Sequence, residues 1–222
     1  MEDIEPERKE MNDFFENASS IYESISYYAQ LYRYYGGINV YLPEIQVPVI
    51  NEILQEGINE MLQVNKGPVL DIACGTGMFT RSISCNSSKV YGADISWSML
   101  NKALEYSKSL DNISFLRARA EALPFNENIF EGVSCCGALH LFSDVSTVLM
   151  EMNRVLKKNG KLAVMTYLKN ELLGTKYLKD FDKNNIHFFE IDELEDIVKK
   201  NGFSEFKYKL YGSIILFEAK KI

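Results

Sequence analysis

A short apolar segment at residues 69–72 runs directly into a glycine turn at Gly75 and Gly77, and a helical pattern follows. An apolar run bounded by turn residues is typical of a buried strand in a parallel sheet. Glycines in such a turn allow a ligand to approach the backbone, and the N–H groups that open the following helix can receive an anionic group. We therefore expect a strand–turn–helix unit that binds a ligand at the carboxyl end of the strand.

The rest of the chain alternates strands and helices. Further strands are expected at 89–93, 113–117, 129–135 and 161–168, and helices at 48–64, 78–84, 97–109, 145–156 and 191–200. The stretch 157–160, Lys-Lys-Asn-Gly, is expected to end the helix before it, with cations at its last turn and glycine just beyond. This alternation predicts a mainly parallel sheet that is covered by helices on both faces.

The last two predicted strands, 203–210 and 213–220, are separated only by Tyr211 and Gly212. Such a short connection predicts a hairpin, which places one antiparallel strand in the sheet. We therefore predict an α/β fold: a three-layer sandwich around a seven-stranded, mainly parallel sheet with one antiparallel strand from a C-terminal hairpin.

The N-terminal part has a different character, and we divide the chain into a helical cap or lid at 1–45 and one ligand-binding domain at 46–222. Seven tyrosines lie between positions 22 and 41. In one interpretation this segment closes over the ligand and some tyrosines line an acceptor pocket, with Tyr22 and Tyr28 as catalytic candidates. In the alternative, the segment is an amphipathic helix that packs on the sheet with its hydroxyl groups in water.

The composition limits the classes of partner. A net charge of −7 disfavours nucleic acid, which requires a basic face. The four cysteines, at 74, 85, 135 and 136, lack the spacing of a zinc site, so we expect no metal and reduced thiols in the cytoplasm. No apolar run is long enough to predict a membrane span. We expect a monomer or a homodimer.

Two acidic residues identify the ligand more closely. Asp71 lies at the end of the first strand and can receive an ammonium group beside the glycine turn, which can receive a carboxylate. Asp94 ends the second strand and can accept hydrogen bonds from both hydroxyls of a ribose. A nucleoside with an amino-acid tail, S-adenosylmethionine (SAM), fits this pair. A nicotinamide dinucleotide fits less well, because Thr80 stands where its fingerprint requires a third glycine.

Six short motifs in the same order as in a known family support this interpretation. They are Leu-Asp-Ile-Ala-Cys-Gly-Thr-Gly at 70–77, Gly-Ala-Asp-Ile-Ser at 92–96, and the segments 118–125, 130–133, 137–142 and 155–161. With them the chain resembles the class I SAM-dependent methyltransferases of the ubiquinone and menaquinone biosynthesis group. The resemblance implies the Rossmann-like methyltransferase fold, SAM as cofactor and S-adenosylhomocysteine (SAH) as product.

The resemblance also assigns the cofactor contacts by position. The methionine part of SAM would contact Asp71, Gly75 and Gly77, and the ribose would contact Asp94. The adenine would lie against Ile95, with its edge near Ala120 and Glu121, and the sulfonium would lie near Cys135 and Cys136. The remaining predicted cofactor-binding residues are Ala73, Cys74 and Met99. Taken singly, each has a simpler interpretation: a tight turn, an acid that flanks a helix, or a solvated loop charge.

Methyl transfer from a sulfonium mainly requires alignment of the acceptor, and a base only where the acceptor must lose a proton. His140, after the fourth predicted strand, is the candidate base; alternatively it only packs in its loop. We expect a methyltransferase acting on a small aromatic or apolar acceptor. The alternatives are a non-catalytic SAM or SAH binder serving as partner or sensor, and aminopropyl transfer, which would need more acids near 135–140 than Asp144 alone.

Overall fold

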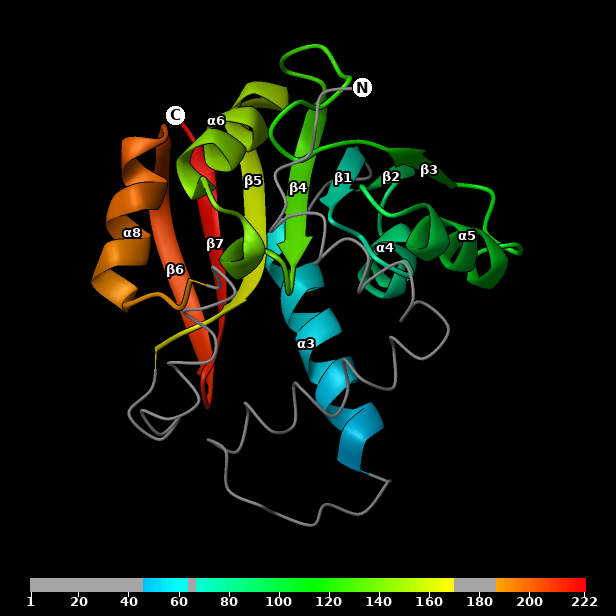
Figure 1. Cartoon of the computed structure of the whole chain (residues 1–222), viewed down its shortest axis with the longest axis horizontal. Helices are drawn as coiled ribbons and strands as arrows, with labels where there is room; N and C mark the ends of the chain where they lie inside the picture. Colours follow the sequence, from blue (N-terminus) through cyan, green and yellow to red (C-terminus); the bar gives the residue numbers. More distant parts are fainter. Residues whose placement is uncertain (1–45, 64–66, 170–186) are drawn as a thin grey trace.

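The computed structural model describes residues 46–63, 67–169 and 187–222 (Figure 1). The expected cap at 1–45, with Tyr22 and Tyr28, lies outside the described residues. Among those residues, no helix combines the length and the apolar character that crossing a membrane requires.

In the described part of the chain, seven strands form a single sheet. They are β1 (Pro68–Ile72), β2 (Lys89–Asp94), β3 (Ile113–Arg117), β4 (Phe130–Cys136), β5 (Leu156–Tyr167), β6 (Phe203–Tyr211) and β7 (Ile214–Lys221). Their order is β3-β2-β1-β4-β5-β7-β6. Strands β1 to β5 pair in parallel, while β7 pairs antiparallel with both β5 and β6. The predicted sheet, with one antiparallel strand from the C-terminal hairpin, is confirmed.

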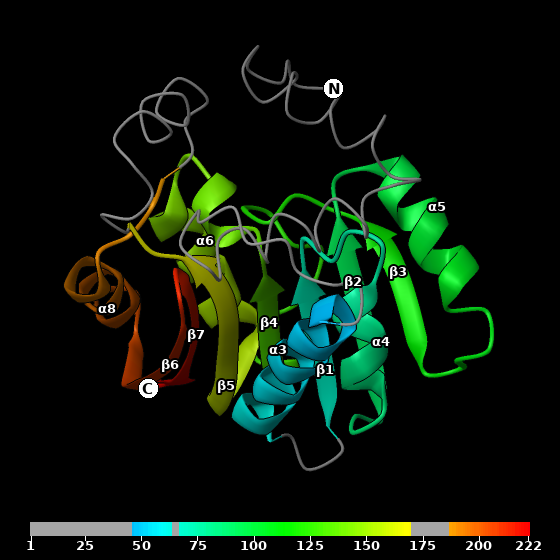
Figure 2. The same cartoon turned by 90° about the horizontal axis from the view of Figure 1, so that it is seen from below.

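Helices cover both faces of this sheet and complete the three predicted layers (Figures 1 and 2). They are α3 (Gln46–Leu62), α4 (Met78–Ser84), α5 (Trp97–Tyr106), the 3-10 turn η1 (Leu139–Leu141), α6 (Val145–Val155) and α8 (Ile191–Lys200). Figure 1 shows β3 with α5 at one end of the sheet and β6 with α8 at the other.

Alternate residues along the strands divide the core between the two faces. On β1, Val69 joins the cluster formed by α3 and α4, whereas Leu70 and Ile72 join the cluster formed by α6 and α8. All three are at most 1% exposed, and burying an aliphatic side chain of this size contributes about 1.5–3 kcal/mol. Gly57 lets α3 approach β7 closely, since a Cβ atom there would lie 2.6 Å from Leu216 Cδ1. The strand that carries the glycine turn is therefore held from both sides.

Helix α6 ends within one residue of the predicted position, but the stretch 157–160 is already part of β5 and does not form the predicted helix stop. Helix α6 ends at Val155, and Leu156 already has extended backbone angles and begins β5. Asn159 has φ 62°, and the pairing of β4 with β5 shifts its register here, so the stretch forms an irregular start to the strand. Gly160 is needed because a Cβ atom would lie 2.8 Å from the Lys157 carbonyl oxygen. The same residue types that end helices therefore build a bulge in this chain.

Candidate functional site

The segments that follow β1, β2 and β3 meet at the carboxyl edge of the sheet. The Cys74 amide donates to the Ala93 carbonyl (3.1 Å), which links the turn after β1 to the end of β2. The Ala118 amide donates to the Asp94 carbonyl (3.0 Å), which links the segment after β3 to the same place. Three of the predicted cofactor-binding segments are therefore joined by backbone hydrogen bonds.

The glycine turn between β1 and α4 has left-handed backbone angles. Gly75 has φ 55° and Gly77 has φ 80°, and the Gly77 amide donates to the Cys74 carbonyl (2.9 Å). A Cβ atom at position 77 would lie 3.1 Å from Phe115 Cζ and 3.2 Å from Ala103 Cβ. The turn thus needs glycine both for its backbone angles and for its close packing against β3 and α5.

Asp94 holds the glycine turn and the start of α5 together. Its Oδ2 accepts from the Gly75 amide (2.8 Å) and its Oδ1 from the Ser96 amide (2.9 Å). Ser96 in turn caps α5, because its hydroxyl accepts from the Met99 amide (3.2 Å). A carboxylate oxygen can accept more than one hydrogen bond. The contact of Asp94 with the hydroxyls of a ribose stays a prediction.

Asp71 lies deeper, beneath the turn, and is 1% exposed. Its Oδ2 accepts from the Thr80 hydroxyl (2.6 Å) and its Oδ1 from the Ser134 hydroxyl (2.7 Å). Burial, with a small contribution from the negative charge of Asp94, raises the pKa of this carboxyl from 3.8 to about 6. The hydrogen bonds from the two hydroxyls act in the opposite direction and lower the pKa. From the sequence, Thr80 was noted only as the residue in place of a third glycine, and Ser134 was not singled out. Ser134 reaches Asp71 because β4 pairs it directly opposite Asp71, whereas Thr80 reaches it from α4.

The predicted cysteines lie in the same region as neutral thiols. Burial, and then the negative charges of Asp71 and Asp94, raise the pKa of the Cys74 thiol well above its usual range. Burial likewise raises the pKa of Cys135 and Cys136 at the end of β4. These side chains therefore offer soft packing surface rather than nucleophiles. Their contact with a sulfonium stays a prediction.

The residues predicted to face the adenine lie on the segments after β2 and β3. Ile95 is half-buried, and its carbonyl accepts from Arg117 Nε (2.7 Å). Met99 is 2% exposed, in the interior of α5. Ala120 is buried in the loop after β3, and Glu121 next to it lies 3.7 Å from Arg119 Nε. The structure brings Ile95 and this loop to the same edge as the glycine turn.

His140 lies in η1, just after β4, and is 3% exposed. Its Nδ1 lies 3.4 Å from the Thr166 hydroxyl, and its ring packs edge-on against Tyr167 (4.7 Å) and stacks with Phe188 (6.3 Å). The His140 carbonyl accepts from the His187 amide (2.9 Å). This buried aromatic setting suits the packing interpretation of His140 as well as the catalytic one, so its role as a base stays a prediction.

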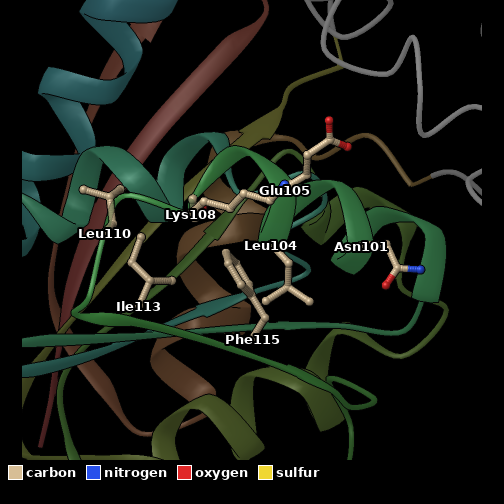
Figure 3. A pocket seen from close by; sticks show the side chains of 8 residues that line it. Asn101, Leu104, Glu105, Lys108, Leu110, Ile113 and Phe115 are labelled. Atoms are coloured by element: carbon tan, nitrogen blue, oxygen red, sulfur yellow. The ribbon is translucent and has the colours of Figure 1, made fainter.

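A cavity of about 620 Å³ lies elsewhere, between α5 and the edge strand β3 (Figure 3). Leu104 and Phe115 face each other in it, and Glu105 and Lys108 stand at its rim (Figure 3). Of the described residues, none that was predicted to bind the cofactor lines it. Phe115 separates this cavity from the glycine turn, because it also lies against Gly77.

Comparison with known proteins gives the family. A family model described as a methyltransferase domain matches residues 70–164. The demethylmenaquinone methyltransferase of Lactococcus lactis is 34% identical over 172 residues, which cover 65% of this chain and 68% of that protein. The chain belongs to the class I SAM-dependent methyltransferases of the ubiquinone and menaquinone biosynthesis group.

A second relative agrees with this family, and a solved structure shares the fold. The ubiquinone/menaquinone biosynthesis C-methyltransferase of Hahella chejuensis is 39% identical over 147 residues, 58% of this chain and 59% of that protein. The solved structure of phosphoethanolamine N-methyltransferase 2 from Haemonchus contortus, a complex with SAM, shares the fold with a TM-score of 0.69 at 18% identity, over 76% of this chain and 52% of that one. The chain spans roughly half to two thirds of the length of several curated relatives of this methyltransferase family.

Proposed function

We propose that this chain transfers the methyl group of SAM to a small aromatic acceptor of the quinone-precursor class. The observation that carries the proposal is the contact of Asp94 with the Gly75 amide, which fixes a carboxylate at the rim of the glycine turn. The names of the relatives, which refer to ubiquinone, menaquinone and demethylmenaquinone, support the class of acceptor.

The residues at the carboxyl edge fit SAM by their chemistry. Asp94 presents a carboxylate for the ribose hydroxyls, and Asp71 provides negative charge beneath the place of the ammonium group. Gly92 lets Phe115 and Cys74 pack closely against β2 beside the glycine turn, because a Cβ atom there would lie 2.6 Å from Phe115 Cδ1 and 3.0 Å from Cys74 Sγ. When bound, SAM supplies an electrophilic methyl group. The protein then needs only to orient that group toward the acceptor.

His140 is the proposed base for an acceptor that must lose a proton. Helix η1 holds its ring beside Thr166 and Tyr167, at the carboxyl ends of β4 and β5. A neutral imidazole has one ring nitrogen that can accept a proton from the acceptor. H140Q should lower kcat while leaving SAM affinity within about twofold of the unmodified chain.

Calorimetry with SAM tests the cofactor claim. D94A removes both carboxylate acceptors and should weaken binding by at least about tenfold, since a hydrogen bond to a charged group contributes about 1.5–3 kcal/mol. D196N, at an exposed acid of α8, is the matched control and should bind SAM normally. Absence of SAM binding by the unmodified chain would refute the proposal.

Release of SAH tests the catalytic claim. The chain is incubated with SAM and a panel of reduced quinones, with and without an unsubstituted carbon beside the ring hydroxyl. We expect SAH and a methylated ring carbon only from quinols that carry that free position. SAM binding without turnover on any quinol or on a cell extract would instead establish the non-catalytic alternative.

A further inference from the structure

The loop between β3 and β4 is held by two side chains of α6. Arg154 Nη1 donates to the Phe125 carbonyl (2.7 Å), and Arg154 Nη2 donates to the Leu123 carbonyl (3.1 Å). Glu151 Oε1 accepts from the Leu123 amide (2.8 Å). Three backbone groups of the loop are thus bound by two residues that are one helical turn apart.

The two side chains are themselves locked together. Arg154 Nε donates to Glu151 Oε2 (2.7 Å), and Arg154 Nη2 donates to Glu151 Oε1 (2.7 Å), which makes a bidentate pair. The opposite face of α6, with Val148, Leu149 and Met152, is fully buried in the core. The pair therefore stands on a rigid base, and it presents one acceptor and two donors to the loop in a fixed geometry.

The ends of the loop do not depend on this pair of side chains. The Ala118 amide is bonded to the Asp94 carbonyl (3.0 Å) at one end. At the other end, the Asn128 and Ile129 amides donate to the main-chain carbonyls of Arg154 and Val155 (3.0 and 2.9 Å). Replacing the Glu151 and Arg154 side chains leaves all of these backbone contacts and the apolar packing of Leu123 and Phe125, and it removes the three hydrogen bonds in the middle of the loop.

We propose that Glu151 and Arg154 are positioning residues for the adenine of SAM. They hold Leu123 and Phe125 in place, and Ala120 and Glu121 lie on the same loop just before them. This inference rests on the proposed function, because the loop can contact an adenine only if the chain binds SAM. Without the clamp, Leu123 and Phe125 keep their apolar packing but lose three backbone hydrogen bonds, so the loop is less precisely held. Removing this added freedom on binding costs conformational entropy, which weakens the adenine contacts. The methionine and ribose contacts, on the glycine turn and Asp94, are not part of the clamp.

The test compares two ligands that differ only at the adenine edge, SAH and S-inosylhomocysteine, by calorimetry. We expect the unmodified chain to prefer SAH by about tenfold. R154A and E151Q should weaken SAH binding by about three- to tenfold and S-inosylhomocysteine binding by less than about twofold, so that the preference is largely lost. A merely structural role would weaken both ligands equally.

A charge-swapped double variant, E151R with R154E, separates the clamp from a simple helix ion pair. An ion pair alone would be restored by the swap, whereas the swap points a cation at the Leu123 amide and an anion at two carbonyls. We therefore expect no rescue of the SAH preference. The matched control is K199A on α8, which breaks a comparable helix pair with Glu195 (2.6 Å) and should leave both affinities unchanged. Thermal melting of each variant confirms that it is folded.

The outcomes are distinguishable. If R154A lowers both affinities alike, or if the swap restores the preference, the clamp proposal is overturned. If the unmodified chain binds both ligands equally, the adenine-edge role of the loop is wrong, and the clamp proposal with it, while the proposed function stands. If the unmodified chain binds neither ligand, the proposed function itself is overturned.

Discussion

Replacing Asp71 by asparagine should stabilise the protein above pH 6. The carboxyl group is 1% exposed, and burial raises its pKa from 3.8 to about 6. At neutral pH the folded state must therefore keep a charge in a buried place, whereas the unfolded state keeps it in water. Asparagine has nearly the same shape and no charge, so it removes that cost.

The size of the effect follows from the shift. A rise of about two pKa units corresponds to about 3 kcal/mol of destabilisation once the group is ionised in both states. Below pH 3.8 the group is protonated in both states, and the cost is absent. It grows as the pH rises from 3.8 and is complete above about pH 6. The hydroxyls of Thr80 and Ser134 can rotate to accept from the asparagine amide, so we subtract only about 1 kcal/mol for poorer hydrogen bonds.

Urea unfolding of both proteins between pH 3.5 and 8 provides the measurement. The difference in unfolding free energy between D71N and the unmodified chain should rise with pH by about 2–3 kcal/mol and level off above pH 6. Other titrating groups cancel in this difference. S134A is the companion variant: it removes a donor to the carboxylate and should destabilise the protein mainly above pH 6. A difference that stays flat from pH 3.5 to 8 would show that Asp71 is not desolvated and would refute the reasoning.

Two further predictions concern the turn and the thiols. G77A should destabilise the protein by about 1–3 kcal/mol in thermal melting. The reason is that φ 80° is strained for alanine, and the alanine Cβ atom would lie 3.1 Å from the Phe115 ring. An unchanged melting temperature would contradict the tight turn. Ellman's reagent should modify a single thiol rapidly in the native protein, at the exposed Cys85, because burial raises the pKa of the other three; C85S should abolish this fast phase.

The sheet and the rim of the site follow from local patterns that a sequence displays directly. Strand–helix alternation gives the parallel strands, and the two-residue gap at Tyr211 and Gly212 gives the hairpin that the structure confirms. The glycine turn and Asp94 follow as well, because both lie at strand ends and such ends meet at one edge of a parallel sheet.

Contacts that depend on register or on long loops were not predictable. Ser134 meets Asp71 only because β4 pairs with β1 in one particular register, and a shift of one residue would turn that hydroxyl to the other face. The hydrogen bond from the Leu123 amide to Glu151 joins residues that are 28 positions apart in the sequence. The spacing of Glu151 and Arg154 predicts only an ion pair within the helix, so it gives no sign of the contact with the loop. The bulge at 157–160 uses residues that also end helices, so composition alone could not separate the two.

Asp71 and Asp94 differ in their effect on folding stability and in the contacts that they make. Asp94 accepts backbone amides at the rim, whereas Asp71 is buried and bound by two hydroxyls at a net cost to folding. A buried carboxylate with a raised pKa attracts a cation more strongly than one in water, because the cation restores the stabilisation that burial removed. The ammonium of a bound SAM would supply such a charge. D71N should therefore make the fold more stable and the cofactor bind less well, a trade-off expected where a carboxylate is kept buried for its charge and not for its packing.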